Sequence, residues 1–398
     1  MEKLNQTLSL CPTCMKVVPA DIIEDEGKVF MQKECCGSRM KFLIDNDAFL
    51  YKKIVLPFKL DTNIEEGQTE SQARKNLCKI RSTMVLYVTS RCNLKCPICY
   101  QSMSGAPDLS MDELETISKN SKSRFFVLSG GEPTVRDDLP QIIETLTKSN
   151  HIVSMTTNGL KFTDIDYLRK LKDSGLREVY LSFDGFDDIV YKTFRGRELL
   201  AEKVKILKNL KRLDVPTSLF CVIKKGFNEK QIKKITKYAM ENNFIELVYF
   251  CVLNEYIHTQ TPKTTLTDVY KAVSSEMNIN MSCFIRWRRL YKLFYTLTKD
   301  DAFASHSFLF KIDKGHLERT DNVLDFLKIV MSYIPHRYFN SFRHELLKAN
   351  NFLKVWIAEV YSPESVDLCR RKSLPNGTEV LNDGSLPFPR LPLHYSTL

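Results

Sequence analysis

The fold is decided by two neighbouring stretches, MVLYVT at residues 84–89 and CNLKCPICY at residues 92–100. The first is a short apolar run with the length of a buried strand. The second carries Cys92, Cys96 and Cys99, with three residues between the first two cysteines and two between the last two. Four thiolates would close a metal site, so three of them leave one coordination position to be explained.

Apolar runs alternate with amphipathic, helix-like segments from residue 84 to residue 253. None of these runs has clean polar alternation, which is typical of parallel strands covered by helices. We therefore predict an α/β fold with a partial (β/α)6 TIM-like barrel, and a doubly wound sheet is the alternative. Helix N-caps are predicted at Ser110 and Thr163. The six predicted strands are residues 84–89, 124–129, 151–157, 177–183, 216–223 and 245–253.

Residues 1–55 are predicted to form a zinc-ribbon or rubredoxin-like metal-binding unit. Its four cysteines are Cys11 and Cys14 in CPTC and, about twenty residues later, the adjacent pair Cys35 and Cys36. Adjacent side chains in an extended segment point in opposite directions, so this pair needs a tight turn, which Gly37 favours. Free thiols in a plain hairpin are the alternative.

Three further segments complete the predicted domain organisation. Residues 56–83 are polar and predict a linker, residues 84–255 the catalytic core, and residues 256–398 a mainly helical region that covers the substrate side. The helical prediction includes FNSFRHELLKANNFLKVWIAEVY at residues 339–361. FIRWRRLYKLFY at residues 284–295 would either cover an anionic group or, as we favour, pack its aromatic side chains inward.

The composition narrows the class of protein. The 398 residues carry a net charge of +10, which favours an anionic partner, although an even scatter of lysines is the simpler interpretation. No apolar run has the roughly 18 residues of a membrane span, and the start of the sequence lacks a signal-peptide pattern, so we expect a cytoplasmic protein. Twelve cysteines in such a protein indicate metal or redox chemistry rather than disulfides.

The cysteine loop follows the first predicted strand, at the end of a barrel where active sites are built. Three cysteines on one loop can ligate three irons of a [4Fe–4S] cluster and leave the fourth iron open. A zinc loop with a fourth ligand elsewhere is the alternative. The loops after the next four strands carry SGGEP (129–133), TTNG (156–159), SFDG (182–185) and VIKKGFN (222–228), and together they predict one small-molecule site at the same rim.

These motifs, in this order over residues 84–253, resemble the radical S-adenosylmethionine (SAM) superfamily, most closely the branch with the molybdenum-cofactor cyclase and the peptide-maturing enzymes. The N-terminal unit resembles that of the tetraether-lipid synthases and the pterin-methyltransferase-like subgroup. The resemblance implies that a [4Fe–4S] cluster cleaves SAM reductively, and that the resulting 5′-deoxyadenosyl radical abstracts a hydrogen atom from a small-molecule or lipid-like substrate. It also implies an electron donor such as flavodoxin or ferredoxin.

The resemblance further implies roles for individual residues. Cys92, Cys96 and Cys99 would bind the cluster. The methionine amino group of SAM would lie at Gly130, Gly131 and Glu132. The ribose would lie near Asn158, Ser182 and Asp184, and the adenine near the backbone at Ile98 and around Ile223.

Two cysteines in the last third of the chain, Cys283 and Cys369, are candidates for auxiliary ligands or hydrogen-atom donors, with inert packing favoured. Two other functions stay open. One is a peptide-modifying radical SAM maturase. The other, of a different class, is a zinc-ribbon protein whose barrel has lost its chemistry and binds nucleic acid.

Overall fold

The computed structural model describes most of the N-terminal half and core of the chain. The described residues are 1–56, 64–69, 72, 83–99, 107–121, 123–253, 264–298, 307–313, 316–318, 352–358 and 378–380. Most of the predicted linker, Tyr100, Cys78 and Cys369 lie outside them.

The N-terminal unit is an antiparallel sheet whose four strands follow one another in sequence order. The turn between the third and fourth strands has positive φ at both central residues, 53° at Cys36 and 73° at Gly37. Two such residues in a two-residue hairpin are the mark of a type I′ turn, so the tight turn expected at Gly37 is present. The sheet is followed by helix α1 (Ala48–Ile54). Its strands are β1 (Glu2–Leu10), β2 (Val17–Asp25), β3 (Lys28–Cys35) and β4 (Ser38–Asp45).

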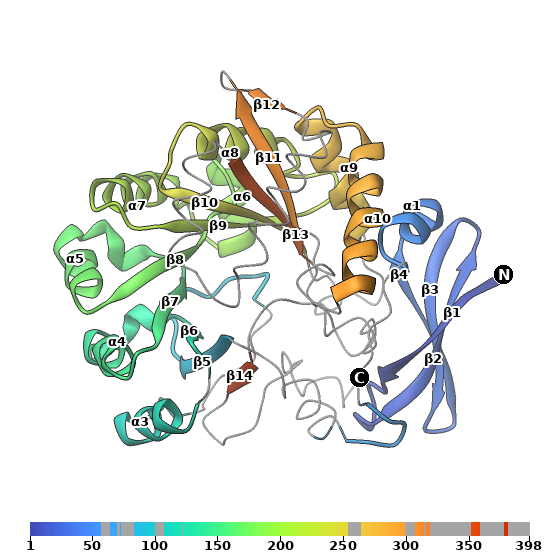
Figure 1. The fold of residues 1–398 in the computed structure, drawn as a ribbon, viewed down its shortest axis with the longest axis horizontal. Coiled ribbons are helices and arrows are strands. Elements are labelled where there is room, and N and C mark those ends of the chain that lie inside the picture. Colours follow the sequence, from blue (N-terminus) through green and yellow to red (C-terminus); the bar gives the residue numbers. More distant parts are fainter. Residues whose placement is uncertain are drawn as a thin grey trace.

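The core contains six parallel strands that pair in sequence order, as in a partial barrel (Figure 1). All six predicted strands are confirmed, and the predicted bounds are within two residues of the observed ones. The alternative of a doubly wound sheet is wrong, because that fold requires the strand order to reverse. The strands are β5 (Thr83–Thr89), β6 (Phe125–Gly130), β7 (Ile152–Thr157), β8 (Leu176–Ser182), β9 (Thr217–Ile223) and β10 (Ile245–Val252).

Helices cover the outer face of this curved sheet (Figure 1). Alternate strand residues such as Leu86, Leu128, Met155 and Leu181 are fully buried beneath them. Because successive side chains of a strand point to opposite faces, the residues between these buried ones face the concave side of the sheet. The covering helices are α3 (Met111–Asn120), α4 (Leu139–Lys148), α5 (Ile165–Asp173), α7 (Leu200–Arg212) and α8 (Lys230–Met240), and the short helix α6 (Asp188–Arg195) follows β8.

The predicted N-cap at Ser110 is confirmed by a complete capping box with Glu113. The predicted cap at Thr163 is wrong by one residue. Asp164 caps α5, and its carboxylate accepts from the backbone N–H groups of Asp166 and Tyr167. Asp competes with Thr for this position because both offer a side-chain oxygen to the first helical turn.

The C-terminal part of the described chain contains both helices and strands. The helix predicted over residues 339–361 is wrong at residues 352–358, which form a strand that pairs in parallel with β10. Val355 and Ile357 of this strand are fully buried. Burial of every second residue beside the edge strand of the barrel thus stabilises a strand here more than the helix propensity of the sequence stabilises a helix. The elements are α9 (Leu266–Glu276), α10 (Met281–Thr298), β11 (Ser307–Asp313), β12 (His316–Glu318), β13 (Phe352–Ala358) and β14 (Thr378–Val380).

Helix α10 contains the basic aromatic segment. Phe284, Trp287 and Tyr291 are buried, and the guanidinium of Arg288, itself buried, donates to the backbone oxygen of Ile54 at 2.9 Å. The favoured interpretation, with the aromatic side chains packed inward, is therefore correct for these three residues. Among the described residues, no helix combines the length and apolarity needed to cross a bilayer.

The end of β4 joins the N-terminal unit to α9 through a buried carboxylate. Asp45 is fully buried and accepts hydrogen bonds from the hydroxyl and backbone N–H of Thr267 and from the backbone N–H of Asp47. Next to it, the amide of Asn46 donates to Asp268 at 2.8 Å. Burial raises the pKa of Asp45 to about 7, against the hydrogen bonds, which act to lower it.

This pKa predicts how the stability of the protein depends on pH. An unfolded Asp ionises near pH 4, whereas folded Asp45 stays protonated until about pH 7. Between these pH values the folded state binds more protons, so the Asp45 contribution to stability falls as the pH rises. The free energy of unfolding of wild type should therefore lose the Asp45 contribution between pH 5 and pH 8. We expect this loss to be absent in Asp45→Asn, as measured by urea unfolding of both proteins at the same metal content.

Asp25→Asn serves as the matched control on the same sheet. The Lys41 ammonium lowers the pKa of Asp25, so this carboxylate is ionised in both states above pH 5 and its loss should not change the pH dependence there. Equal pH dependence of wild type and Asp45→Asn would contradict the assignment.

Candidate active site and N-terminal metal centre

The cysteine loop leaves the carboxyl end of β5 at the barrel rim. Cys92 and Cys99 are exposed and Cys96 is partly buried, and none of them forms a disulfide. The backbone N–H of Leu94 donates to the Cys92 sulfur at 3.4 Å, and that of Cys99 donates to the backbone oxygen of Cys96 at 3.0 Å. The loop is thus locally ordered and presents three thiols.

The loop after β6 passes very close to the backbone that leads into the cysteine loop. The backbone N–H of Gly131 donates to the oxygen of Thr89 at 2.9 Å, and that of Glu132 to the oxygen of Arg91 at 2.8 Å. A Cβ atom at Gly131 would lie 2.4 Å from the Arg91 oxygen, so no other residue allows this approach. The glycine holds two rim loops together.

The Glu132 carboxylate is buried between the loops that follow β6 and β7. It accepts from the Thr134 hydroxyl at 2.7 Å, the Thr157 hydroxyl at 2.6 Å and the backbone N–H of Asn158 at 2.7 Å. The predicted role of Glu132 toward an ammonium group stays a prediction. In this structure the carboxylate joins the two loops.

Asn158 joins the β7 end to the cysteine loop. Its side-chain amide donates to the Asn93 side-chain oxygen at 2.7 Å, one residue beyond Cys92. The three predicted motifs CNLKCPICY, SGGEP and TTNG are therefore brought together at one rim by direct hydrogen bonds.

The end of β8 contributes a buried ion pair. The guanidinium of Arg195 binds Asp184 through two hydrogen bonds of 2.7 and 3.0 Å, and Asp184 is fully buried. The backbone N–H of Val222 also donates to Asp184, at 3.2 Å, which ties in the β9 end. Partial burial raises the pKa of Cys96, and the nearby Arg195 guanidinium acts against this increase. Arg195 thus connects the β8 end to the cysteine loop.

The remaining predicted residues lie in different surroundings. Ser182 ends β8 and Ile98 is partly buried on the cysteine loop, whereas the Ile223 side chain is buried in the core at the end of β9. Cys283 is buried in α10 among core side chains, as the packing interpretation expects. The roles proposed for these residues stay predictions.

Three residues of the rim were not predicted: Asn93, Arg195 and Lys203. Lys203 is almost completely buried, although it belongs to a lysine-rich helix. Its position was detectable in principle, since Lys203, Ile206, Leu207 and Leu210 share the buried face of α7. The contacts of Asn93 and Arg195 depend on tertiary pairing and left no local signal.

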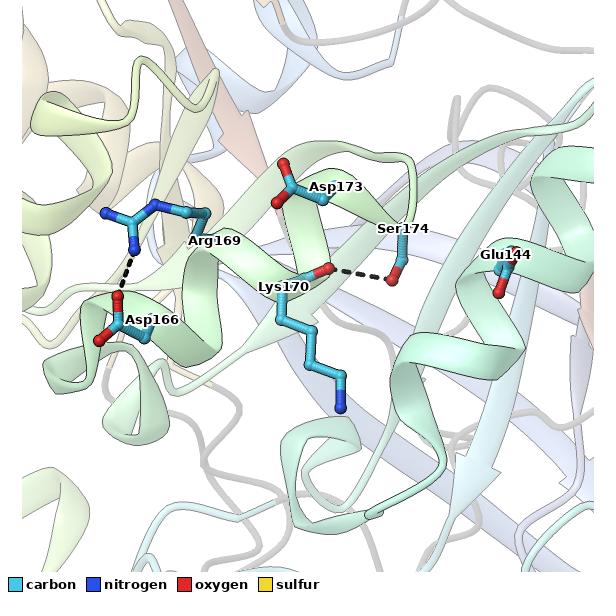
Figure 2. Close-up of a pocket in the computed structure, with 6 residues that line it drawn as sticks. All are labelled: Glu144, Asp166, Arg169, Lys170, Asp173 and Ser174. Carbon is cyan, nitrogen blue, oxygen red and sulfur yellow. Dashed lines mark hydrogen bonds and ion pairs between the residues drawn. The ribbon is translucent and has the colours of Figure 1, made fainter.

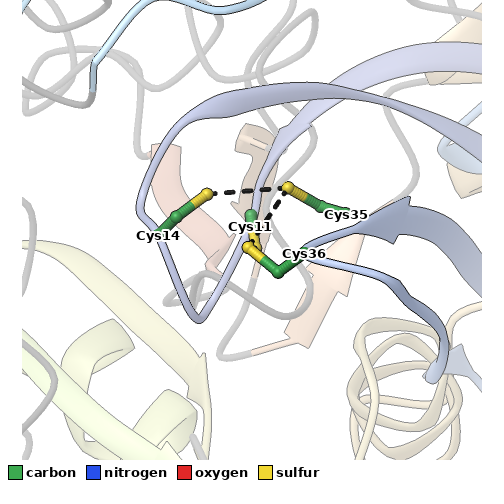
Figure 3. Close-up of side chains that lie close together, drawn as sticks. All are labelled: Cys11, Cys14, Cys35 and Cys36. Carbon is green, nitrogen blue, oxygen red and sulfur yellow. Dashed lines mark hydrogen bonds between the residues drawn. The ribbon is translucent and has the colours of Figure 1, made fainter.

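The four N-terminal cysteines converge from two turns, that between β1 and β2 and that between β3 and β4 (Figure 3). Their sulfur atoms all lie within 4.8 Å of one another, and the contacts Cys14–Cys35, Cys35–Cys36 and Cys11–Cys36 measure 3.6, 3.6 and 4.0 Å. A tetrahedral zinc site with Zn–S bonds of about 2.3 Å has sulfur atoms about 3.8 Å apart. The adjacent pair therefore fits the same ion.

The close packing of the thiols shifts their pKa values in opposite directions. Burial acts to raise the pKa of Cys11, but the backbone N–H groups of Cys14 and Thr13 lower it to about 7. Contact with the Cys14 thiol raises the pKa of Cys35 to about 12. Thiol groups this close together cannot all ionise unless a cation lies among them, and a metal ion would be such a cation.

A separate hollow of about 510 Å³ lies on the outside of the barrel between α4 and α5 (Figure 2). Its charged groups are partly satisfied within α5, where Arg169 pairs with Asp166. Its position on the helical layer separates it from the rim. The residues that line it are Glu144, Asp166, Arg169, Lys170, Asp173 and Ser174.

Two segments of the chain match known protein families. Residues 86–239 match the radical SAM superfamily, and residues 3–37 match the HMPTM N-terminal zinc ribbon domain. The chain thus carries a radical SAM domain and, before it, this N-terminal zinc ribbon domain. The cofactors of the superfamily are a [4Fe–4S] cluster and SAM, and the zinc ribbon adds a second metal site.

The sequence of the chain is also similar to parts of two named proteins. It is 35% identical over 264 residues to the 7,8-dihydro-6-hydroxymethylpterin dimethyltransferase of Methanocaldococcus jannaschii, covering 61% of this chain and 51% of that protein. It is 33% identical over 180 residues to a probable GTP 3′,8-cyclase of Pyrococcus horikoshii, covering 44% and 57%. The chain thus spans little more than half the length of these relatives.

Among solved structures, Streptococcus suis SuiB bound to S-adenosylmethionine is similar over 52% of this chain and 49% of that one, with 18% identity and a TM-score of 0.42. This likeness is too weak to assign any feature of the site.

Removal of one N-terminal thiol tests the second metal site. We expect Cys14→Ser to lose a single metal ion per chain, measured as zinc and iron by plasma mass spectrometry, and to lower the unfolding temperature. The loss should be large, because structural zinc binds small peptides with about 10–16 kcal/mol.

The control is Cys251→Ser, which alters a thiol on β10 outside the N-terminal unit. Unchanged metal content in Cys14→Ser would contradict the four-cysteine site.

Proposed function

We propose that the chain binds a [4Fe–4S] cluster through Cys92, Cys96 and Cys99 and uses SAM at the adjoining rim to abstract a hydrogen atom from a small-molecule substrate. The observation that carries this proposal is the direct bonding of the cysteine loop to the loops after β6 and β7, through Gly131, Glu132 and Asn158. Three thiols outside any disulfide, together with the polar loops at the same rim, fit a cluster with one open iron.

The bound cofactors would supply one electron and a carbon-centred radical, which is the chemistry common to the superfamily. The residues of the chain hold and orient them. The three thiols would supply the cluster ligands, and the Gly130–Gly131 turn lets the backbone approach a ligand where a side chain would not fit. Asn158, Ser182 and Asp184 would lie on the ribose side, and the backbone near Ile98 and Ile223 on the adenine side.

The buried partners of these residues support a positioning role rather than a proton-transfer role. Asp184 accepts hydrogen bonds from Arg195 and from a backbone N–H group, and Glu132 accepts four, from Thr134, Thr157 and Asn158. Carboxylates fixed in this way hold their loops in one geometry, which favours a reaction whose difficult step belongs to the cofactor.

The names of the relatives favour a small heterocyclic substrate. One is named for a dihydropterin and the other for GTP. The proposal includes a lipid-like or anionic substrate as alternatives, and flavodoxin or ferredoxin as the electron donor. The zinc-ribbon nucleic-acid-binding alternative is disfavoured by the intact thiols and rim loops.

Anaerobic reconstitution tests the proposal. We expect a brown protein that releases 5′-deoxyadenosine from SAM after reduction, and Cys96→Ala should lose cluster iron and this release together, because the cluster would lack a ligand. Chromatographic detection of 5′-deoxyadenosine measures the activity, and iron content measures the cluster.

Cys251→Ala is the matched control and should retain both cluster and cleavage. A wild-type protein that contains zinc only and leaves SAM intact would refute the enzyme proposal. Full cleavage by Cys96→Ala would refute the ligand assignment.

A further inference from the structure

A buried lysine joins the ends of two barrel strands at the candidate site. Lys203 of α7 is 1% exposed, and its ammonium donates to the backbone oxygen of Asn158 at 2.6 Å and to that of Ser182 at 2.5 Å. Asn158 follows β7 and Ser182 ends β8. A side chain from the covering helix thus reaches the rim of the sheet.

The ammonium acts where backbone pairing stops. In the ladder between β7 and β8 the last pair is Thr157 with Leu181, one residue before Asn158 and Ser182. Beyond this point the ladder does not set the distance between the two strand ends. Lys203 bonds to both carbonyl oxygens and therefore sets it instead.

Burial of this charge needs compensation. An ammonium taken out of water is costly unless hydrogen bonds and opposite charges replace its hydration. The two carbonyl oxygens supply the bonds, the charges of Asp184 and Glu132 favour the ammonium, and the Tyr191 ring lies 6.0 Å away. Burial, and secondarily the charge of Arg195, still lower the pKa of Lys203 to about 8. A methionine would fill this space more cheaply, which points to a role for the charge beyond packing.

We propose that Lys203 is a positioning residue for SAM, which fixes the separation of Asn158 and Ser182 and so aligns their contacts to the ribose. The inference rests on the proposed function, because that function places these two residues at the ribose. Lys203 touches strand ends only and is not assigned a contact with SAM.

Lys203→Met tests this role in the protein with its cluster intact and unreduced, where binding is measured without turnover. We expect the affinity for SAM, measured by equilibrium dialysis, to fall about tenfold or more, since hydrogen bonds from a charged donor hold the site. The iron content should be unchanged. Lys203→Gln, whose amide reaches one carbonyl, should give a smaller loss and replaces the methionine variant if that one does not fold.

Lys33→Met is the matched control. Lys33 is also buried, and its ammonium donates to the backbone oxygen of Leu10 at 2.7 Å and to the Ser9 hydroxyl at 3.0 Å, within the N-terminal sheet. Loss of this buried ammonium should lower stability but leave SAM affinity unchanged. An equal loss of affinity in both variants would mean that general destabilisation is the cause and would overturn the inference.

A SAM analogue that lacks both ribose hydroxyls separates positioning from a purely structural role. Wild type should bind the analogue more weakly than SAM, whereas Lys203→Met should bind the two with similar affinity, because its ribose contacts are already lost. The same fold loss for SAM and for the analogue would overturn the inference.

Failure of the inference and failure of the proposed function give different results. If wild type with a complete cluster does not bind SAM, the proposed function falls and the inference falls with it. If wild type binds SAM and Lys203→Met binds it equally well, only the inference is refuted.

Discussion

The buried carboxylate of Glu132 is the interaction on which the rim of the barrel depends. A buried carboxyl group is tolerated only when hydrogen bonds replace its water, and here the donors come from the segments that end or follow two different strands. The backbone of Asn158, held by this carboxylate, in turn directs its amide to Asn93 in the cysteine loop. One buried side chain therefore sets the relative position of three loops that follow three different strands.

The two groups of cysteines differ in the kind of centre they suit. In the N-terminal unit the backbone brings four sulfur atoms within the span of a single ion, with two of the ligands adjacent in a type I′ turn. The cysteine loop instead offers three thiols at an open rim. Polar contacts also join the N-terminal sheet to the end of a barrel strand. Asn46 binds Asp268, and Asp268 pairs with Lys225, two residues after the end of β9.

Local patterns were sufficient to predict the six core strands and the Ser110 cap, because each depends on neighbours in the sequence. The strand at residues 352–358 was mistaken for a helix, since its period-2 burial exists only once β10 lies beside it. Lys203 was missed for a related reason. Its helix carries several lysines, and although the spacing of α7 places residue 203 on the buried face, the carbonyl oxygens that its ammonium binds come from two distant strand ends.

The pairing of β13 with β10 and of β14 with β5 has a consequence for the newly made chain. Both edges of the six-stranded sheet are closed by segments that the ribosome produces after all six strands. Until then β5 and β10 present unpaired backbone groups, which can template pairing with other chains. β14 thus protects β5 from misassembly, and truncation before β13 would leave a sheet with two open edges.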